Sequence, residues 1–219
     1  MKPWIELARA PAPGGGELSL HRRDRELVIR VDGQELMSSR RHASEDHLAA
    51  VGCAGVGAGR VLIGGLGMGF TLRAALAALP AGARLVVAEL SAAVVAWNRE
   101  LLGPEAAATL RDPRVRLEIA DVAALLTEPG GYDAILLDVD NSPHALTQPA
   151  NRSLYAAAGL AAAHRALRPG GRLAVWSAER APPFSRRLTA AGFAVELHDA
   201  RAHRGRGATH TIYVGRRPR

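Results

Sequence analysis

The pattern of hydrophobic and polar positions changes at about Arg60 and again near the C-terminus. Residues 17–39 alternate between apolar and polar side chains at most positions, with turn-forming residues at Asp24 and at Asp32-Gly33. This period of two predicts a small antiparallel hairpin or a three-stranded unit. The residues before it, 1–16, end in the sequence PAPGGG and are expected to form a flexible, turn-prone lead.

From Arg60 onward the pattern changes to apolar runs separated by segments of helical periodicity. The runs are rich in aliphatic and β-branched residues, which is typical of parallel strands that are buried on both faces. The tail departs from this rhythm, because its last two strands are separated only by the sequence HRGRG and should form an antiparallel hairpin. The expected strands are 60–64, 84–89, 114–120, 132–138, 171–178, 193–202 and 208–216, and the expected helices are 69–79, 91–102, 121–127 and 151–167.

These patterns divide the chain into two parts. We expect a short N-terminal β-hairpin region at residues 1–43 and a Rossmann-like α/β domain at residues 44–219, whose mostly parallel sheet ends in the antiparallel hairpin. The second part is expected to open with a helix at Ser44. Glu45 and Asp46 would then lie in the first turn, where the helix dipole favours acidic side chains.

Composition narrows the class of protein. With 219 residues, 48% of them hydrophobic, the chain is long enough for one large domain with a proper core. No apolar run approaches the length of a membrane span, and the N-terminus lacks the apolar core of a signal peptide, so we expect a cytoplasmic protein with no membrane partner. The single cysteine, Cys53, excludes an internal disulfide. His198, His203 and His210 do not have the spacing of a recognisable metal site, so no metal is expected.

The net charge of +7 would suit a nucleic-acid partner. Almost all the basic residues are arginines, since Lys2 is the only lysine, and they are scattered along the chain. Aromatic residues, at 4% of the chain, are not interleaved with them. We therefore interpret the charge as a compositional bias and expect no nucleic-acid partner.

A glycine-rich stretch, VLIGGLGMGF at residues 61–70, follows the first apolar run. The dinucleotide fingerprint Gly-x-Gly-x-x-Gly fails here, because Phe70 stands where the third glycine would follow Gly65 and Gly67. A nucleotide phosphate loop is excluded because it needs a lysine. Gly65-x-Gly67-x-Gly69 between a strand and a helix instead fits the tight turn that packs against the ribose and amino-acid end of S-adenosylmethionine.

Acidic residues follow three of the expected strands. In an open parallel sheet, ligands bind beyond the carboxyl ends of the strands, where Glu89, Asp121 and Asp138 should lie. Glu89 is suited to accept hydrogen bonds from both ribose hydroxyls, and Asp121 from the exocyclic amine of adenine. Alternatively, Asp121 caps a helix and Glu89 is an ordinary solvated carboxylate. The expected cofactor-binding residues are Gly64, Gly65, Leu66, Gly67, Met68, Gly69, Glu89, Leu90, Asp121, Val122 and Asp138.

These motifs resemble those of the spermidine synthase-like branch of the S-adenosylmethionine-dependent methyltransferase superfamily. The likeness runs from about Gly33 to the C-terminus, through VLIGGLGMG, VVAELSAAVVAWNRE, ADVAALL, YDAILLDVD and LAVWSA. The pair Leu154-Tyr155, followed by LRPGG, is more particular to the polyamine synthases. The resemblance implies a Rossmann-like fold, S-adenosylmethionine or its decarboxylated form as cofactor, and a homodimer.

The chain departs from the polyamine synthases at three points. In those enzymes an Asp-x-x-Asp pattern at the fourth strand supplies a proton acceptor for the attacking amine. Here the second position is Asn141, which cannot act as a base, although Asp140 could replace it. The synthases also carry an Asp in the glycine turn that is absent here, and their polycationic substrate favours an acidic protein.

We therefore expect methyl transfer to a small acceptor, with aminopropyl transfer and a non-catalytic binding subunit as alternatives. Asp138 would orient the methionine end of the cofactor or the acceptor, and His144 would act as a general base or be an ordinary loop histidine. Tyr155 and Trp176 would line the acceptor pocket or pack in the core. The candidate catalytic residues are Asp138, Asp140, Asn141 and His144.

Overall fold

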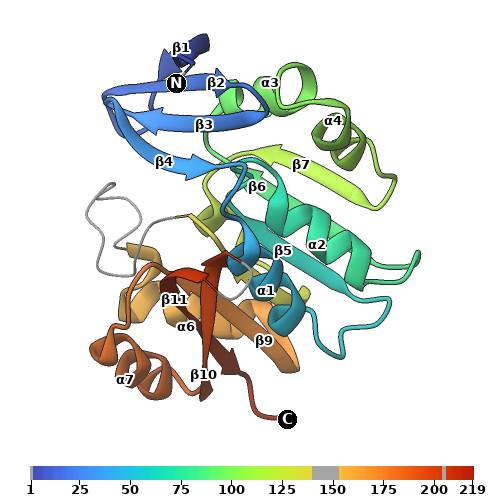
Figure 1. Cartoon of the computed structure of the whole chain (residues 1–219). Helices are drawn as coiled ribbons and strands as arrows, with labels where there is room; N and C mark the ends of the chain where they lie inside the picture. The colour runs from blue at the N-terminus through green and yellow to red at the C-terminus, as the bar shows by residue number, and fades with distance from the viewer. Residues whose placement is uncertain (1, 140–152, 204–205) are drawn as a thin grey trace.

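Two β-sheets organise the chain. The structure is a computed structural model, and it describes residues 2–139, 153–203 and 206–219. A four-stranded antiparallel sheet lies at the N-terminal end, and a seven-stranded sheet forms the body of the molecule. Figure 1 shows the small sheet at the top of the molecule, beside α3 (Ala92–Glu100).

The small sheet is an up-and-down meander, with neighbouring strands in chain order. Asp24 and Asp32 adopt positive φ angles of 56° and 47°, so both turns expected from the sequence are confirmed. The expectation of a flexible lead at residues 1–16 is wrong, because its apolar residues form an edge strand that packs toward Met68. The four strands are β1 (Ile5–Pro11), β2 (Glu17–Arg23), β3 (Glu26–Val31) and β4 (Gln34–Ser38).

The large sheet confirms the mostly parallel fold with an antiparallel end. Its strand order is β10-β11-β9-β8-β5-β6-β7, and β11 runs antiparallel to both β9 and β10. The chain leaves β5 toward β6 on one side and returns to β8 on the other, so the carboxyl end of β5 is a topological switch point. The strands are β5 (Arg60–Gly64), β6 (Arg84–Glu89), β7 (Val115–Ile119), β8 (Tyr132–Leu137), β9 (Leu167–Ser177), β10 (Ala194–His203) and β11 (Arg206–Arg216).

Helices cover both faces of this sheet. Val61 and Ile63 point into one apolar core, whereas Leu62 points into the other, as the alternation of a strand requires. The first of these cores includes Leu48 of α1, and the second includes Leu160 of α6. The remaining helices are α1 (Ala43–Gly52), α2 (Phe70–Ala78), α4 (Pro104–Leu110), the 3-10 helix η1 (Val122–Leu125), α6 (Ala157–Ala166) and α7 (Pro182–Ala190).

The helix expected at Ser44 is present and begins one residue earlier, at Ala43. Its N-cap residue is His42, and no side chain caps the helix. The Ser44 hydroxyl is instead buried and makes tertiary contacts. Across residues 2–139, 153–203 and 206–219, no helix combines the length and apolar character needed to cross a membrane.

Candidate functional site

The glycine turn joins β5 to α2 at the switch point of the large sheet. Gly65, Gly67 and Gly69 all have positive φ angles, of 87°, 53° and 80°. A Cβ atom at Gly65 would lie 2.3 Å from the backbone oxygen of Asp138, so this glycine is needed for space as well as for conformation. The turn therefore packs directly against the end of β8.

Asn98 on α3 supports the turn from its other side. Its buried side-chain amide donates hydrogen bonds to the carbonyl oxygens of Gly67, at 2.8 Å, and Val94, at 2.9 Å. Its Oδ1 atom would lie 3.2 Å from a Cβ atom at Gly69. We did not anticipate this role from the sequence, because a single Asn in a helix carries no signal of its tertiary partner.

Glu89, at the end of β6, is held in place by two backbone groups. The N–H of Leu66 donates to its Oε2 atom at 2.9 Å, and the N–H of Ser91 donates to its Oε1 atom at 2.8 Å. Each carboxylate oxygen can accept more than one hydrogen bond, so both retain acceptor capacity toward the adjacent cavity. The glycine turn thus fixes the orientation of the acid.

Asp121 and Asp138 complete a row of acids along the carboxyl ends of the strands. The Oδ1 atom of Asp121 accepts a hydrogen bond from the N–H of Ala123 at 2.9 Å, so the helix-capping interpretation is correct for this residue. The Oδ2 atom of Asp138 accepts one from the Thr71 hydroxyl at 2.7 Å. Burial raises the pKa of Asp138 to about 6, although the hydrogen bond from Thr71 opposes the shift.

A cavity connects these acids with the small sheet. One wall carries Glu89, Asp121 and Asp138, and the opposite wall is the apolar face of the small sheet. None of the residues that line it in the described part of the chain is basic. The lining residues are Ala12, Pro13, Gly15, Leu18, Ile29, Val31, Leu36, Met37, Gly65, Gly67, Ala88, Glu89, Leu90, Ser91, Val94, Ala120, Asp121, Val122, Asp138 and Val139.

The expected cofactor-binding residues divide into two groups. Leu66 and Met68 are buried in apolar clusters, Gly64 packs against Val122, and Gly69 is the N-cap residue of α2. The wall from the small sheet was missed, because the alternating pattern predicts strands but does not show where their apolar face docks. The residues that line the cavity as expected are Gly65, Gly67, Glu89, Leu90, Asp121, Val122 and Asp138.

The expected acceptor side of the site is described only in part. Asp140, Asn141 and His144 lie outside the described residues. Tyr155 is buried in a core cluster and meets Phe184 edge to face, with ring centroids 5.7 Å apart. This position corresponds to the core-packing alternative for Tyr155.

Trp176 contacts a different core cluster from Tyr155. Its indole meets His210 edge to face, with centroids 4.7 Å apart. The Nε1 atom of Trp176 is buried and has no hydrogen-bond partner among the described residues.

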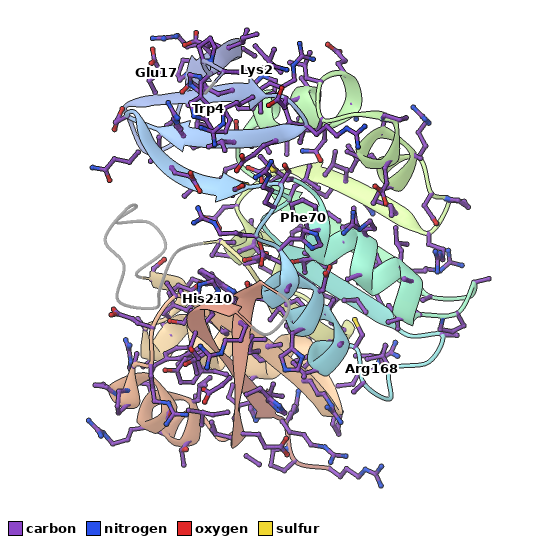
Figure 2. All side chains as sticks on the ribbon, viewed as in Figure 1. Lys2, Trp4, Glu17, Phe70, Arg168 and His210 are labelled. Carbon is purple, nitrogen blue, oxygen red and sulfur yellow. The ribbon has the colours of Figure 1, made fainter. Side chains whose placement is uncertain are left out.

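A second polar cluster, which the sequence did not reveal, surrounds Glu45 at the start of α1. The Ser44 hydroxyl donates to Oε2 of Glu45, and the Nδ1 atom of His210 lies 3.0 Å from the same hydroxyl oxygen. Burial raises the pKa of Glu45 to about 7, and repulsion from Asp138 adds to the shift. Figure 2 shows Phe70 just below the small sheet and His210 on β11, further down the molecule.

The chain matches no protein-family model and no curated protein sequence. Its fold matches that of a spermidine synthase in complex with the transition state analogue AdoDATO, with a TM-score of 0.79 and 18% identity over 96% of this chain and 73% of the other. The spermidine synthase from Thermotoga maritima matches with a TM-score of 0.74 and 17% identity over 96% and 72%.

A methyltransferase shares the fold as well. The Burkholderia thailandensis 1,6-didemethyltoxoflavin-N1-methyltransferase, with bound 1,6-didemethyltoxoflavin and S-adenosylhomocysteine, matches with a TM-score of 0.60 and 20% identity over 81% of this chain and 80% of the other. The resemblance inferred from the motifs is therefore confirmed at the level of the fold. The chain has the architecture that spermidine synthases share with S-adenosylmethionine-dependent methyltransferases.

The close approach of Gly65 to β8 generates a stability prediction. Gly65→Ala should lower the free energy of unfolding by more than about 3 kcal/mol, because a positive φ costs an alanine about 1–2 kcal/mol and the Asp138 carbonyl must also move. Gly55→Ala is the matched control, because Gly55 also has a positive φ, of 76°, but has no atom within 4 Å of its Cβ position. Urea unfolding of both variants provides the measurement, and equal losses would contradict the packing argument.

The raised pKa of Glu45 generates a second stability prediction. A carboxyl group whose folded pKa lies above its unfolded value binds more protons in the folded state, so its contribution to stability falls as the pH rises from about 4.5 to about 7. Glu45→Gln should therefore be more stable than the parent at pH 8, and this advantage should vanish near pH 4.5. Urea unfolding at both pH values tests the sign, and a pH-independent difference would contradict it.

Proposed function

We propose that this protein is a transferase that binds S-adenosylmethionine and transfers its methyl group to a small acceptor. The observation that carries the proposal is the Glu89 carboxylate, which two backbone N–H groups hold beside the glycine turn and the cavity. A fixed carboxylate with spare acceptor capacity suits a ribose diol. It would repel a phosphate, as would Asp121 and Asp138 along the same wall.

The residues present fit an adenosyl group along this wall. Glu89 would accept hydrogen bonds from the ribose hydroxyls, and the free oxygen of Asp121 would accept one from the adenine amine. Leu90 and Val122, which follow these acids, offer apolar surface to the base. Among the fold neighbours, one holds the analogue AdoDATO and another holds S-adenosylhomocysteine, which is consistent with this assignment.

The methionine end would lie toward the glycine turn. No side chain caps α2, whose N-cap is Gly69, so its first N–H groups and the positive end of its dipole are suited to a carboxylate. When bound, S-adenosylmethionine supplies an electrophilic methyl group on a positively charged sulfur. The protein would align the acceptor with that group and remove a proton from it, for which Asp138 is the described candidate.

Aminopropyl transfer from decarboxylated S-adenosylmethionine is the second candidate. One observation favours it, namely the acidic character of the described cavity. No basic side chain lines this cavity, but the acid Asp138 lines it. A second acid, Glu45, interacts electrostatically with Asp138. A decarboxylated donor ends in an ammonium group without a carboxylate, which suits such a wall. Against it, the glycine turn carries no acid, and Asn141 stands where the synthases have their second Asp.

The role of Glu89 leads to a binding prediction. Glu89→Ala should weaken S-adenosylmethionine binding by about tenfold to a hundredfold, because a pair of charge-assisted hydrogen bonds is lost, at roughly 1.5–3 kcal/mol. Isothermal titration calorimetry with S-adenosylmethionine, its decarboxylated analogue and methylthioadenosine gives the affinities and the preferred donor. Glu118→Ala is the control, because Glu118 lies on the neighbouring β7 and pairs with Arg116 instead.

Two results would contradict this assignment. An unchanged dissociation constant in a folded Glu89→Ala variant would remove Glu89 from the site. Binding of NAD with comparable strength would overturn the choice of an adenosyl sulfonium over a dinucleotide.

The absence of a second Asp leads to an activity prediction. We expect no useful aminopropyl transfer to putrescine, because the amide of Asn141 can hold an ammonium group but cannot remove its proton. Asn141→Asp should then raise any trace activity. The assay follows methylthioadenosine release from decarboxylated S-adenosylmethionine and putrescine. Turnover in the usual enzymatic range of about 1 to 10³ per second by the parent protein would contradict the prediction, and its loss in Asp140→Asn would identify the base.

A further inference from the structure

A second cleft lies at the end of the large sheet opposite the cavity beside the glycine turn. It is formed by the loop after α1, the starts of β8 and β9, and residues 216–219. The parallel strands β5 and β8 begin at this end and run toward the cavity, so the length of the strands separates the two sites. Figure 2 shows Arg168, which lines the cleft, toward the end of the molecule opposite the small sheet.

Four arginines line this arginine cleft, namely Arg168, Arg172, Arg216 and Arg219. The first two lie on β9, Arg216 ends β11, and Arg219 follows it. Arg172 and Arg216 are directly opposite each other in the antiparallel register of β9 and β11, so their side chains share one face of the sheet. Like charges in this arrangement are destabilising. An anion bound between the two guanidinium groups would relieve their repulsion.

Hydrogen bonds hold residues 216–219 against the start of β9. The N–H of Gly170 donates to the carbonyl oxygen of Arg217 at 2.9 Å, and the N–H of Arg217 donates to that of Gly171 at 2.9 Å. The Arg217 guanidinium donates to the carbonyl oxygen of His164, near the end of α6, at 2.9 Å. The segment that carries two of the four arginines is therefore fixed in place beside the cleft.

The acid in the arginine cleft is already engaged. Asp133 is the one acidic side chain among the described residues that line the cleft. Its two carboxylate oxygens accept hydrogen bonds from Nη1 of Arg168 at 2.9 and 3.0 Å. Its Oδ2 atom also accepts the N–H of Arg60 at 2.7 Å. Asp133 therefore offsets the charge of Arg168 and leaves the other three arginines unmatched.

These three guanidinium groups give the cleft its character. Within residues 2–139, 153–203 and 206–219, no acidic side chain forms an ion pair with Arg172, Arg216 or Arg219. Arg172 is half-buried and donates to the carbonyl oxygen of Val51 at 3.2 Å, which holds its guanidinium at the wall. Four arginines and one aspartate give the described lining a net charge of +3. The arginine cleft is therefore suited to an anion that carries several charges.

We propose that the arginine cleft binds a compact phosphate-bearing anion, either inorganic diphosphate or the diphosphate group of a small molecule, through Arg172, Arg216 and Arg219. This site is separate from the proposed transfer reaction and goes beyond it. A guanidinium group presents its N–H donors in a planar fork that matches two phosphate oxygens. An anion with two phosphate groups can meet more than one such fork, and its charge balances that of the cleft.

The described lining favours a small anion over a nucleic acid. No aromatic side chain is among the described residues that line the cleft, so they offer no surface on which a base could stack. The apolar side chains there are small, as Ala54, Val56 and Pro169 are. Recognition in the cleft would therefore rest on phosphate oxygens alone.

The test measures the binding of inorganic diphosphate to the full chain by isothermal titration calorimetry. Arg216→Gln and Arg172→Gln should each weaken binding by about tenfold, because charge-assisted hydrogen bonds are lost. Arg84→Gln is the matched control, since Arg84 is exposed and begins β6 at the same end of the sheet but does not line the cleft. Its affinity should stay close to that of the parent. Equal losses in all three variants, or no binding by the parent, would overturn the proposal.

A charge reversal separates loss of the site from loss of the fold. Arg216→Glu places an acid directly opposite Arg172, and opposite charges at such a position favour strand pairing. The variant should therefore resist urea at least as well as the parent, while its affinity for diphosphate falls by more than about tenfold. Unchanged affinity in the folded variant would remove Arg216 from the site and refute the proposal.

Two competitors check the identity and the place of the ligand. Single-stranded RNA should bind more weakly than diphosphate. Tighter binding of RNA that is lost in Arg216→Gln would assign the cleft to nucleic acid instead. S-adenosylmethionine should leave the affinity for diphosphate unchanged, and displacement of diphosphate by it would place the anion in the cavity beside the glycine turn and overturn the proposal.

Discussion

The contact between Gly65 and the end of β8 is the constraint on which the site depends. The N–H of Gly65 donates to the carbonyl of Ala88 on β6 at 2.8 Å, while its missing side chain leaves room for the Asp138 carbonyl. The turn thus joins the ends of the three central parallel strands. Leu66, the residue after Gly65, donates a hydrogen bond from its N–H to the Glu89 carboxylate. At the start of α2, the Thr71 hydroxyl donates a hydrogen bond to Asp138. Two acids of the cavity are therefore positioned by the same turn.

The fold could be predicted from the sequence at the strands that are buried on both faces, because such strands need apolar residues. The strands 60–64 and 84–89 have the expected bounds, because the interior of a central parallel strand is a near-continuous apolar run. β1 was missed since an edge strand requires little of its sequence beyond a partner to pair with. α4 and α7 were missed because both are short and begin with proline, which resembles a loop in a sequence pattern.

The site could be predicted from the sequence only at residues that combine a suitable functional group with a recognisable local motif. Glu89 follows a strand and faces a glycine turn, so its position could be argued from topology alone. In the sequence, Glu45 is recognisable only as an acid in the first turn of a helix. The helix dipole alone accounts for an acid at that position, so the sequence indicates no tertiary partner for it. Its relation to Asp138 depends on how α1 docks on the sheet. The same limit applies to Asn98 and to the apolar wall that includes Met37, because docking geometry is not encoded in periodicity.

The net charge of the chain, +7, says little about its cavity. Many arginines are matched locally by acids, as Arg114 is by Asp112 and Arg168 by Asp133. Figure 2 shows Arg168 toward the end of the molecule opposite the small sheet. Salt screens charges at the protein surface over about 10 Å, and the charged side chains that line the described cavity are all acidic.

This local field bears on the choice between the two donors. A carboxylate on the donor would need the backbone N–H groups at the start of α2, since the described wall offers no cation. A donor without a carboxylate would bring its ammonium to Asp138, and that acid could not then also take a proton from the acceptor. One described acid facing the acceptor side cannot perform both tasks at once. Methyl transfer assigns Asp138 one task only, and for that reason it is the reaction that we propose.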